Sequence, residues 1–229
     1  TDFSLEPNVS IAPCLHTCMY ALHREIREND MRLYQDWMRT AQSPVFLWSY
    51  YHHPMEPALI DKWKCFPNVM VHETARAMRM FIADGVRGIF VCGEQDMLES
   101  YVIAKIWDDP DLDLDALLDE FFTLYFGAAA EPMKRFYLKI EQIASDPANY
   151  PAPHYRTAGV DWKAVAWECL GTEERMSRLG ALMDQAQAAA STEQEKLRVG
   201  LWHDALWKWM QEGRAAYLAA PAGKTPGNP

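Results

Sequence analysis

Three short segments of the chain carry the side chains best suited to chemistry, and each of them follows or contains an apolar run. The strongest single candidate is Glu94, which follows the run 86–91 and the small residue Gly93. A carboxylate there could act as a general acid, a general base or a nucleophile. Asp96 in the same segment could contact a ligand, although either acid could instead cap the helix expected from that point onward.

A second segment is rich in aromatic residues and histidine. Trp48, Tyr50 and Tyr51 belong to the apolar run 45–51, and His52 follows them. Sugar rings have apolar faces that stack on aromatic rings, and Tyr and His side chains hydrogen-bond to hydroxyl groups. In a strand, alternation would place Trp48 and Tyr50 on the face opposite Tyr51. The segment therefore predicts contacts to a carbohydrate, with packing at a strand end as the alternative interpretation.

The third segment contains Cys14, His16, Cys18 and His23, which are residue types found in zinc sites. Their spacing matches no standard zinc-ligand pattern, and the sequence has no second paired cluster. We therefore expect no metal here, and His16 is better explained as a pocket-lining residue because it follows an expected strand. The other cysteines are isolated, which favours reduced thiols over a disulfide framework.

An acidic run over residues 108–120 has aspartates at the spacing of a calcium-binding loop. Counted from Asp109, however, the sixth position is Leu114, where that loop requires glycine. The residues from Leu114 onward follow an amphipathic helical pattern, and acids near a helix start are favoured by the helix dipole. The run therefore predicts the start of a helix, and the sequence indicates no metal or other cofactor.

The composition restricts the classes of partner. The chain has 229 residues and a net charge of −10, from 22 basic and 32 acidic side chains. Because it offers few cations to neutralise phosphates, we expect no nucleic-acid partner. It has no basic amphipathic segment and no apolar run near the roughly 18 residues of a membrane span, so we expect no membrane association. No signal peptide is visible, and the compartment is not indicated.

The order of apolar and amphipathic segments predicts parallel strand–helix–strand units in the first half. Strands are expected at 9–13, 45–51 and 86–91, with helices at 29–40 and 68–83 between them. The pattern of the second half predicts helices throughout. They are expected at 96–107, 114–126 and 132–144, after the N-caps Asp161 and Thr172, and from the capping box of Thr192 and Glu195 to about residue 218.

The fold class that follows is α/β, namely the last strands and helices of a (β/α)8 barrel followed by an all-α extension. Three parallel strands cannot close such a barrel, which takes about 250 residues on its own. We therefore expect residues 1–110 to be the C-terminal part of a barrel, 111–220 a helical bundle and 221–229 a frayed tail. The N-terminal remainder of the same barrel would then be a partner of this chain.

Several segments, taken in order, are similar to those of a known family. They are LEPNV at 5–9, residues 29–37, FLWSYY at 46–51, GVRGIF at 85–90, YVIAKIWDDP at 101–110 and DEFFTLYFGAA at 119–129. Together they resemble a bacterial family, domain of unknown function 4838, in the TIM-barrel glycoside hydrolase clan. Its members often lie behind an N-terminal domain similar to that of α-glucuronidases. The resemblance covers the chain to about residue 143 and continues loosely through 197–199.

The resemblance implies a glycoside hydrolase-like protein that acts on a carbohydrate, such as a glycan with uronic acids, by carboxylate acid–base chemistry. Glu94 would then be catalytic, and the residues that bind substrate would be His16, Trp48, Tyr50, Tyr51, His52 and Asp96. Hydrolysis needs a second carboxylate, for which the sequence offers no clear candidate, so the partner could lie in strands outside this chain. One departure is Ser49, where we expect many members to carry an acid. A secreted or periplasmic bacterial location is implied by the resemblance alone.

Two alternatives remain open. The chain could be a carbohydrate-binding or protein-interaction module without catalysis, in which the cleft has no working carboxylate pair. It could also be a helical scaffold that uses the stripe of Trp202, Leu206, Trp209 and Met210 for protein contacts. A scaffold predicts that this stripe is exposed as a large apolar patch, whereas ordinary packing predicts that it is buried.

Overall fold

The computed structural model describes residues 5–17, 20, 24–50, 58, 60–92, 97–151 and 160–220, without the side chains of Tyr50, Cys92 and Met97. The chain divides into two compact units. The sheet unit comprises Thr1–His53 and Met70–Leu114, and the helical unit comprises Pro54–Val69 and Asp115–Pro229. Among the described helices, none is long and apolar enough to cross a membrane.

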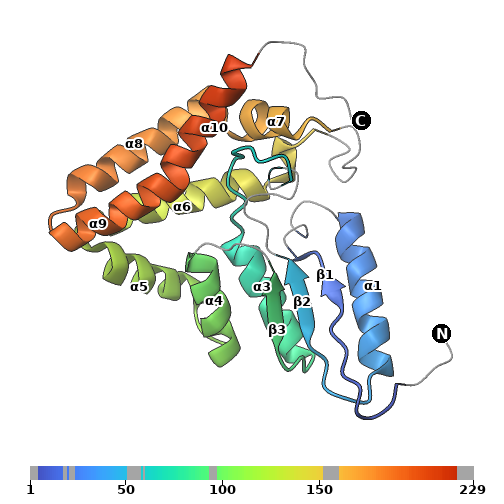
Figure 1. Cartoon of the computed structure of the whole chain (residues 1–229). Helices are drawn as coiled ribbons and strands as arrows, with labels where there is room; N and C mark the ends of the chain where they lie inside the picture. Colours follow the sequence, from blue (N-terminus) through green and yellow to red (C-terminus); the bar gives the residue numbers. More distant parts are fainter. Residues whose placement is uncertain are drawn as a thin grey trace. The chain divides into compact units, whose positions relative to one another are not determined.

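The sheet unit is built on three strands, β1 (Cys14–Leu15), β2 (Leu47–Tyr50) and β3 (Ile89–Cys92). They pair in the order β1-β2-β3, and both pairs are parallel, as the sequence predicted (Figure 1). Cys14 is level with Trp48, and Trp48 with Phe90, so these three residues form one row across the sheet. The three carboxyl ends therefore lie along one edge.

The predicted position of the first strand, 9–13, was wrong by a few residues, because β1 is Cys14–Leu15. The preceding residues still take part in pairing through their carbonyl groups. Phe46 N–H donates to Ile11 O at 2.9 Å, and Trp48 N–H donates to Pro13 O at 3.0 Å. Proline has no N–H to donate, so Pro13 can accept from β2 but cannot form a complete ladder.

Helices pack on one face of the sheet. The helices of this unit are α1 (Arg24–Thr40), α3 (Val71–Ala83) and α4 (Met97–Asp108). Tyr34 of α1 packs its buried ring edge-on against Phe81 of α3, with 5.2 Å between the ring centroids. Its hydroxyl donates to Asp84 at 3.0 Å, and burial together with this carboxylate raises the pKa of Tyr34. Through these two contacts, Tyr34 holds α1 against α3.

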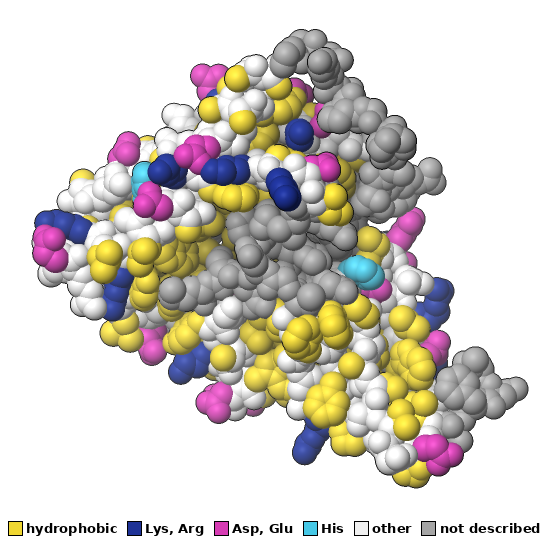
Figure 2. Space-filling model, viewed as in Figure 1, with side chains coloured by type: hydrophobic (Ala, Val, Ile, Leu, Met, Phe, Trp, Pro, Cys, Tyr) yellow, Lys and Arg dark blue, Asp and Glu magenta, His cyan; other side chains and the backbone are white. Residues whose placement is uncertain are grey.

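The other face of the sheet carries exposed aromatic side chains. Phe46, Trp48 and Phe90 keep 42%, 39% and 56% of their surface exposed, while Leu47 and Ser49 on the opposite face are fully buried. The Trp48 and Phe90 rings lie 4.6 Å apart by their centroids. Figure 2 shows hydrophobic side chains gathered over the strands. Alternation along β2 thus separates a buried face from an exposed aromatic face, as predicted for Trp48.

The helical unit contains the remaining elements. They are α5 (Leu114–Phe126), η2 (Gly127–Ala129), α6 (Ala130–Ser145), η3 (Pro147–Asn149), α7 (Trp162–Ala164), the π-helix η4 (Val165–Leu170), α8 (Glu173–Ala189), α9 (Glu193–Trp202), the π-helix η5 (His203–Trp207) and α10 (Lys208–Ala219). The predicted N-caps Asp161 and Thr172 are confirmed. The Asp161 side chain accepts from two backbone N–H groups of the next turn, and the Thr172 side chain accepts from one.

The aromatic stripe of the last helices is part of the core. Trp202 is buried and lies within 6.5 Å, between ring centroids, of Phe121, Phe122, Phe126 and Tyr137. Leu206 and Met210 are buried as well, and Trp209 is half-buried. The packing interpretation of this stripe is therefore confirmed, and the scaffold alternative loses the exposed patch that it requires.

The capping box at the start of α9 is confirmed and also fixes the end of α5. Glu195 accepts from the backbone N–H groups of Ser191, Thr192 and Ala128 at 2.7, 3.0 and 3.2 Å. Gly127 has a positive φ of 55°, and a Cβ there would collide with the Glu195 carboxylate. These hydrogen bonds lower the pKa of Glu195 to about 2 from its ordinary value of 4.5.

This shift predicts an acid-sensitive contribution to stability. A lowered pKa in the folded state stabilises the protein above the ordinary pKa, and the contribution is lost as the pH falls through the folded-state value. In Glu195→Gln the charge is absent, so we expect the wild type to unfold at a higher temperature at pH 6. The difference should shrink between about pH 4.5 and pH 2. Thermal unfolding across this range is the measurement, and a difference independent of pH would contradict the assignment.

Candidate functional site

The carboxyl edge of the parallel sheet is the candidate functional site, since α/β folds place ligands beyond the carboxyl ends of their strands. The structure describes His16, Thr17, Tyr20 and Ser49 near the ends of β1 and β2. Four of the predicted site residues lie outside the described residues, namely Tyr51, His52, Glu94 and Asp96. Tyr50 is placed by its backbone alone, as the last residue of β2.

A buried carboxylate organises the end of β1. Asp30 of α1 is only 3% exposed. Its Oδ2 accepts the His16 backbone N–H at 2.7 Å and the Tyr20 hydroxyl at 3.1 Å, and it lies 3.4 Å from His16 Nδ1. A buried carboxylate requires such partners, because desolvation of an unpaired charge is costly. Asp30 therefore ties α1 to the segment that leaves β1.

Sequence reasoning missed Asp30, although one signal was available. Asp30 lies four residues before Tyr34, so both occupy the same side of α1, and both are buried. A charged residue on the buried side of a helix indicates a specific polar partner. That partner, His16, is far from the helix pattern in sequence, so the pairing itself could not be read from local spacing.

His16 is presented to solvent by this arrangement. Its side chain is 55% exposed while Asp30 beside it is buried. The Asp30 carboxylate lies next to Nδ1 and limits the orientations that the imidazole can adopt. An imidazole is a side chain that can hydrogen-bond a hydroxyl group, and His16 presents one just after β1. The role of His16 in lining a site stays a prediction.

Ser49 has a structural role next to this cluster. Its hydroxyl hydrogen-bonds with the Thr17 hydroxyl, and both side chains are buried. The bond links β2 to the segment after β1. An acidic residue at position 49 would be buried beside Thr17 on the helix-covered face, away from the exposed aromatic face that carries Trp48.

Trp48 and His16 are the predicted ligand-binding residues whose side chains the structure describes. Trp48 lies on the exposed face of β2, against Phe90, with enough free surface to stack on a ring. His16 follows β1, the neighbouring strand, by one residue. Within the described ranges, no three His, Cys, Asp or Glu side chains group closely enough to hold a metal ion.

Comparison with known protein families identifies the family of this chain. The model of a family described as a domain of unknown function, DUF4838, matches residues 1–139. The chain belongs to this family. The match spans the three strands of the sheet and reaches into α6. No curated protein and no solved structure matches the chain significantly. The DUF4838 description names no activity.

Proposed function

We propose that this chain is the C-terminal portion of a glycoside hydrolase-like protein that acts on a carbohydrate, such as a glycan containing uronic acids. The observation that carries the proposal is the polar cluster at the carboxyl edge of the sheet. There Asp30 holds His16 in place at the end of β1. Glu94 follows β3 by two residues in the sequence.

The exposed aromatic face supports the barrel part of the proposal. In a closed (β/α)8 barrel, helices cover the outside, and side chains from alternate positions fill the interior. Phe46, Trp48 and Phe90 occupy the face that would point inward, and each keeps between 39% and 56% of its surface exposed. Removing such apolar surface from water would stabilise the folded protein. Further strands beside β1 or β3 would enclose this face inside the barrel, whose carboxyl end is the side where ligands bind.

The proposed chemistry assigns a separate role to each group. Glu94 acts as a catalytic carboxylate, and strands outside this chain supply the second carboxylate that hydrolysis requires. His16, oriented by Asp30, binds a sugar hydroxyl. Trp48 offers an apolar surface for the ring. Asp30 itself is a positioning residue, because it is buried and engaged by two donors.

A non-catalytic carbohydrate-binding or interaction module is the second candidate. It is favoured by the burial of Asp30, a carboxylate that is too enclosed to reach a substrate. In this version His16 and Trp48 still bind the glycan, but no bond is broken. The two candidates differ in the role of Glu94 alone.

Replacing His16 by alanine tests the site in either version. We expect His16→Ala in the full-length protein to weaken binding of an oligosaccharide by about three- to tenfold, the usual effect of losing one or two hydrogen bonds. The measurement is calorimetric titration with a neutral hexose oligosaccharide and with a hexuronic acid oligosaccharide. Asp30→Asn should cause a similar loss, because it weakens the group that orients His16.

The matched control is His203→Ala in the helical unit. His203 Nδ1 also lies near a carboxylate, Asp204 Oδ1, at 3.0 Å. The control therefore removes a similar histidine–carboxylate pair from the helical unit. Binding should not change in this variant. Equal affinities for the wild type and His16→Ala, or equal losses in both variants, would contradict the proposed site.

A further inference from the structure

A pocket within the helical unit is lined by lysines and aromatic side chains. It has a volume of about 440 Å³ and is formed by the segment 62–64, by α7 with η4, and by α10. Its lining includes three lysines and three aromatic residues, which are Lys62, Lys64, Lys163, Trp63, Trp167 and Tyr217. A cluster of cations around aromatic rings is unusual in a chain with a net charge of −10.

The charges of the pocket leave two cations available to a ligand. Glu212, the acid among the lining residues, forms an ion pair with Lys64, and this ammonium lowers the pKa of Glu212. Among the described residues that line the pocket, Lys62 and Lys163 are the other cations and Glu212 is the acid. The Lys163 ammonium lies 6.0 Å from the centre of the Trp63 ring. A carboxylate bound there would sit beside an aromatic surface.

The aromatic walls suit a sugar ring. Trp63 and Tyr217 are half-buried, and Trp167 behind them is almost fully buried. The Tyr217 hydroxyl donates to Glu168, which raises the pKa of Tyr217 to about 12 and keeps it neutral. An indole face with hydroxyl and ammonium groups around it matches the apolar face and polar rim of a pyranose.

The pocket is held in shape before any ligand arrives. Trp209 Nε1 donates to Cys65 O at 2.8 Å, and Lys64 Nζ lies 5.3 Å from the Trp209 ring centre. Gly213 of α10 lets the backbone of Lys64 and the ring of Trp167 approach closely. These contacts fix the segment 62–65 on α10, and a pre-formed site loses less conformational freedom on binding.

From this arrangement we propose that the pocket binds a sugar that carries a carboxylate, with the ring against Trp63 and the carboxylate between Lys62 and Lys163. The site lies in the helical unit and is separate from the sheet edge. It would hold an acidic glycan whether or not the sheet edge hydrolyses it.

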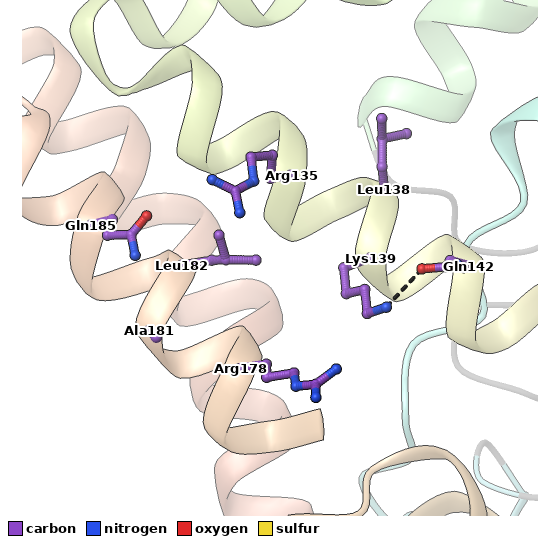
Figure 3. A pocket seen from close by; sticks show the side chains of 8 residues that line it. All are labelled: Arg135, Leu138, Lys139, Gln142, Arg178, Ala181, Leu182 and Gln185. Carbon is purple, nitrogen blue, oxygen red and sulfur yellow. Dashed lines mark hydrogen bonds between the residues drawn. The ribbon is translucent and has the colours of Figure 1, made fainter. Parts of the chain in front are cut away.

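A groove elsewhere in the same unit provides the comparison. It lies between α6 and α8, and Figure 3 shows Arg135 reaching from α6 toward α8 and Arg178 reaching back toward α6. Lys139 in this groove hydrogen-bonds Gln142 at 2.7 Å, and Arg178 pairs with Glu174 at 2.5 Å. The groove has cations but no aromatic ring in its lining. This groove therefore tests whether positive charge without an aromatic ring is enough to bind an acidic sugar.

The experiment is NMR titration of the full-length protein with methyl glucuronide as the probe and methyl glucoside as its neutral counterpart. We expect the glucuronide to bind more tightly than the glucoside. Lys163→Met and Trp63→Ala should each weaken glucuronide binding by about tenfold, the scale of one charge-assisted hydrogen bond or one stacked ring. Trp63→Phe keeps an aromatic ring and should retain most of the affinity, which guards against a folding defect in Trp63→Ala.

Lys139→Met removes the same charge from the α6–α8 groove and should leave binding unchanged. Equal binding of the two glycosides, or a loss in Lys139→Met without a loss in Lys163→Met, would overturn the site. A loss in His16→Ala alone would also overturn it while supporting the sheet edge. Conversely, an unchanged His16→Ala with a weakened Lys163→Met would support this pocket and count against the sheet-edge proposal, so the two outcomes remain distinguishable.

Discussion

Glu94→Gln is expected to abolish hydrolysis of the glycan by the full-length protein while glycan binding is retained. The amide keeps the size of the side chain but can neither donate the proton nor attack the sugar. The loss of an acid–base group typically lowers kcat by about 10²–10⁴-fold. The measurements are steady-state hydrolysis of the oligosaccharide and calorimetric binding of the same compound, made on the wild type and the variant.

The matched control for Glu94→Gln is Asp108→Asn, which removes an exposed carboxylate at the end of α4. It changes the net charge by the same amount and should leave turnover unchanged. Unchanged turnover in Glu94→Gln would remove this residue from the catalytic set. A wild type that binds but does not hydrolyse would favour the binding module instead.

Gly213→Ala is expected to destabilise the helical unit strongly. A Cβ at this position would lie 2.5 Å from a carbon of the Trp167 ring and 2.6 Å from the carbonyl oxygen of Lys64. The backbone oxygen cannot rotate away, so the helix and the segment 62–65 would have to separate. Overpacking of this kind costs about 1–3 kcal/mol. We expect Tm to fall by several degrees in thermal unfolding followed by circular dichroism.

Gly200→Ala in α9 is the matched control because a Cβ there meets no atom within 4 Å. The same substitution at position 200 only removes the backbone flexibility of glycine. This change should stabilise the folded protein by about 0.5–1 kcal/mol. The two variants should therefore shift Tm in opposite directions. A decrease in both, or no change in Gly213→Ala, would contradict the tight packing described for α10.

The features that the sequence predicted correctly depend on local signals. The parallel order of the strands follows from strands that alternate with helices. The caps at Asp161, Thr172 and Thr192 follow from side chains that bond backbone groups within the next turn. Alternation placed Trp48 and Ser49 on opposite faces for the same reason.

The features that it missed depend on contacts between distant residues. Asp30 was overlooked because its partner, His16, follows another element, β1. The segment 54–69 joins the helical unit, and one bond that holds it, from Trp209 to Cys65, spans 144 positions. The π-helices at 165–170 and 203–207 have no marker in the local pattern. Packing decides these features, and packing is not local.

The most direct measurement is a crystal structure of the full-length protein with a bound oligosaccharide. A sugar at the carboxyl ends of β1 and β2, within hydrogen-bond distance of His16, is the predicted result. Sugar density confined to the helical unit, with the His16 imidazole contacting only water and Asp30, would contradict the account.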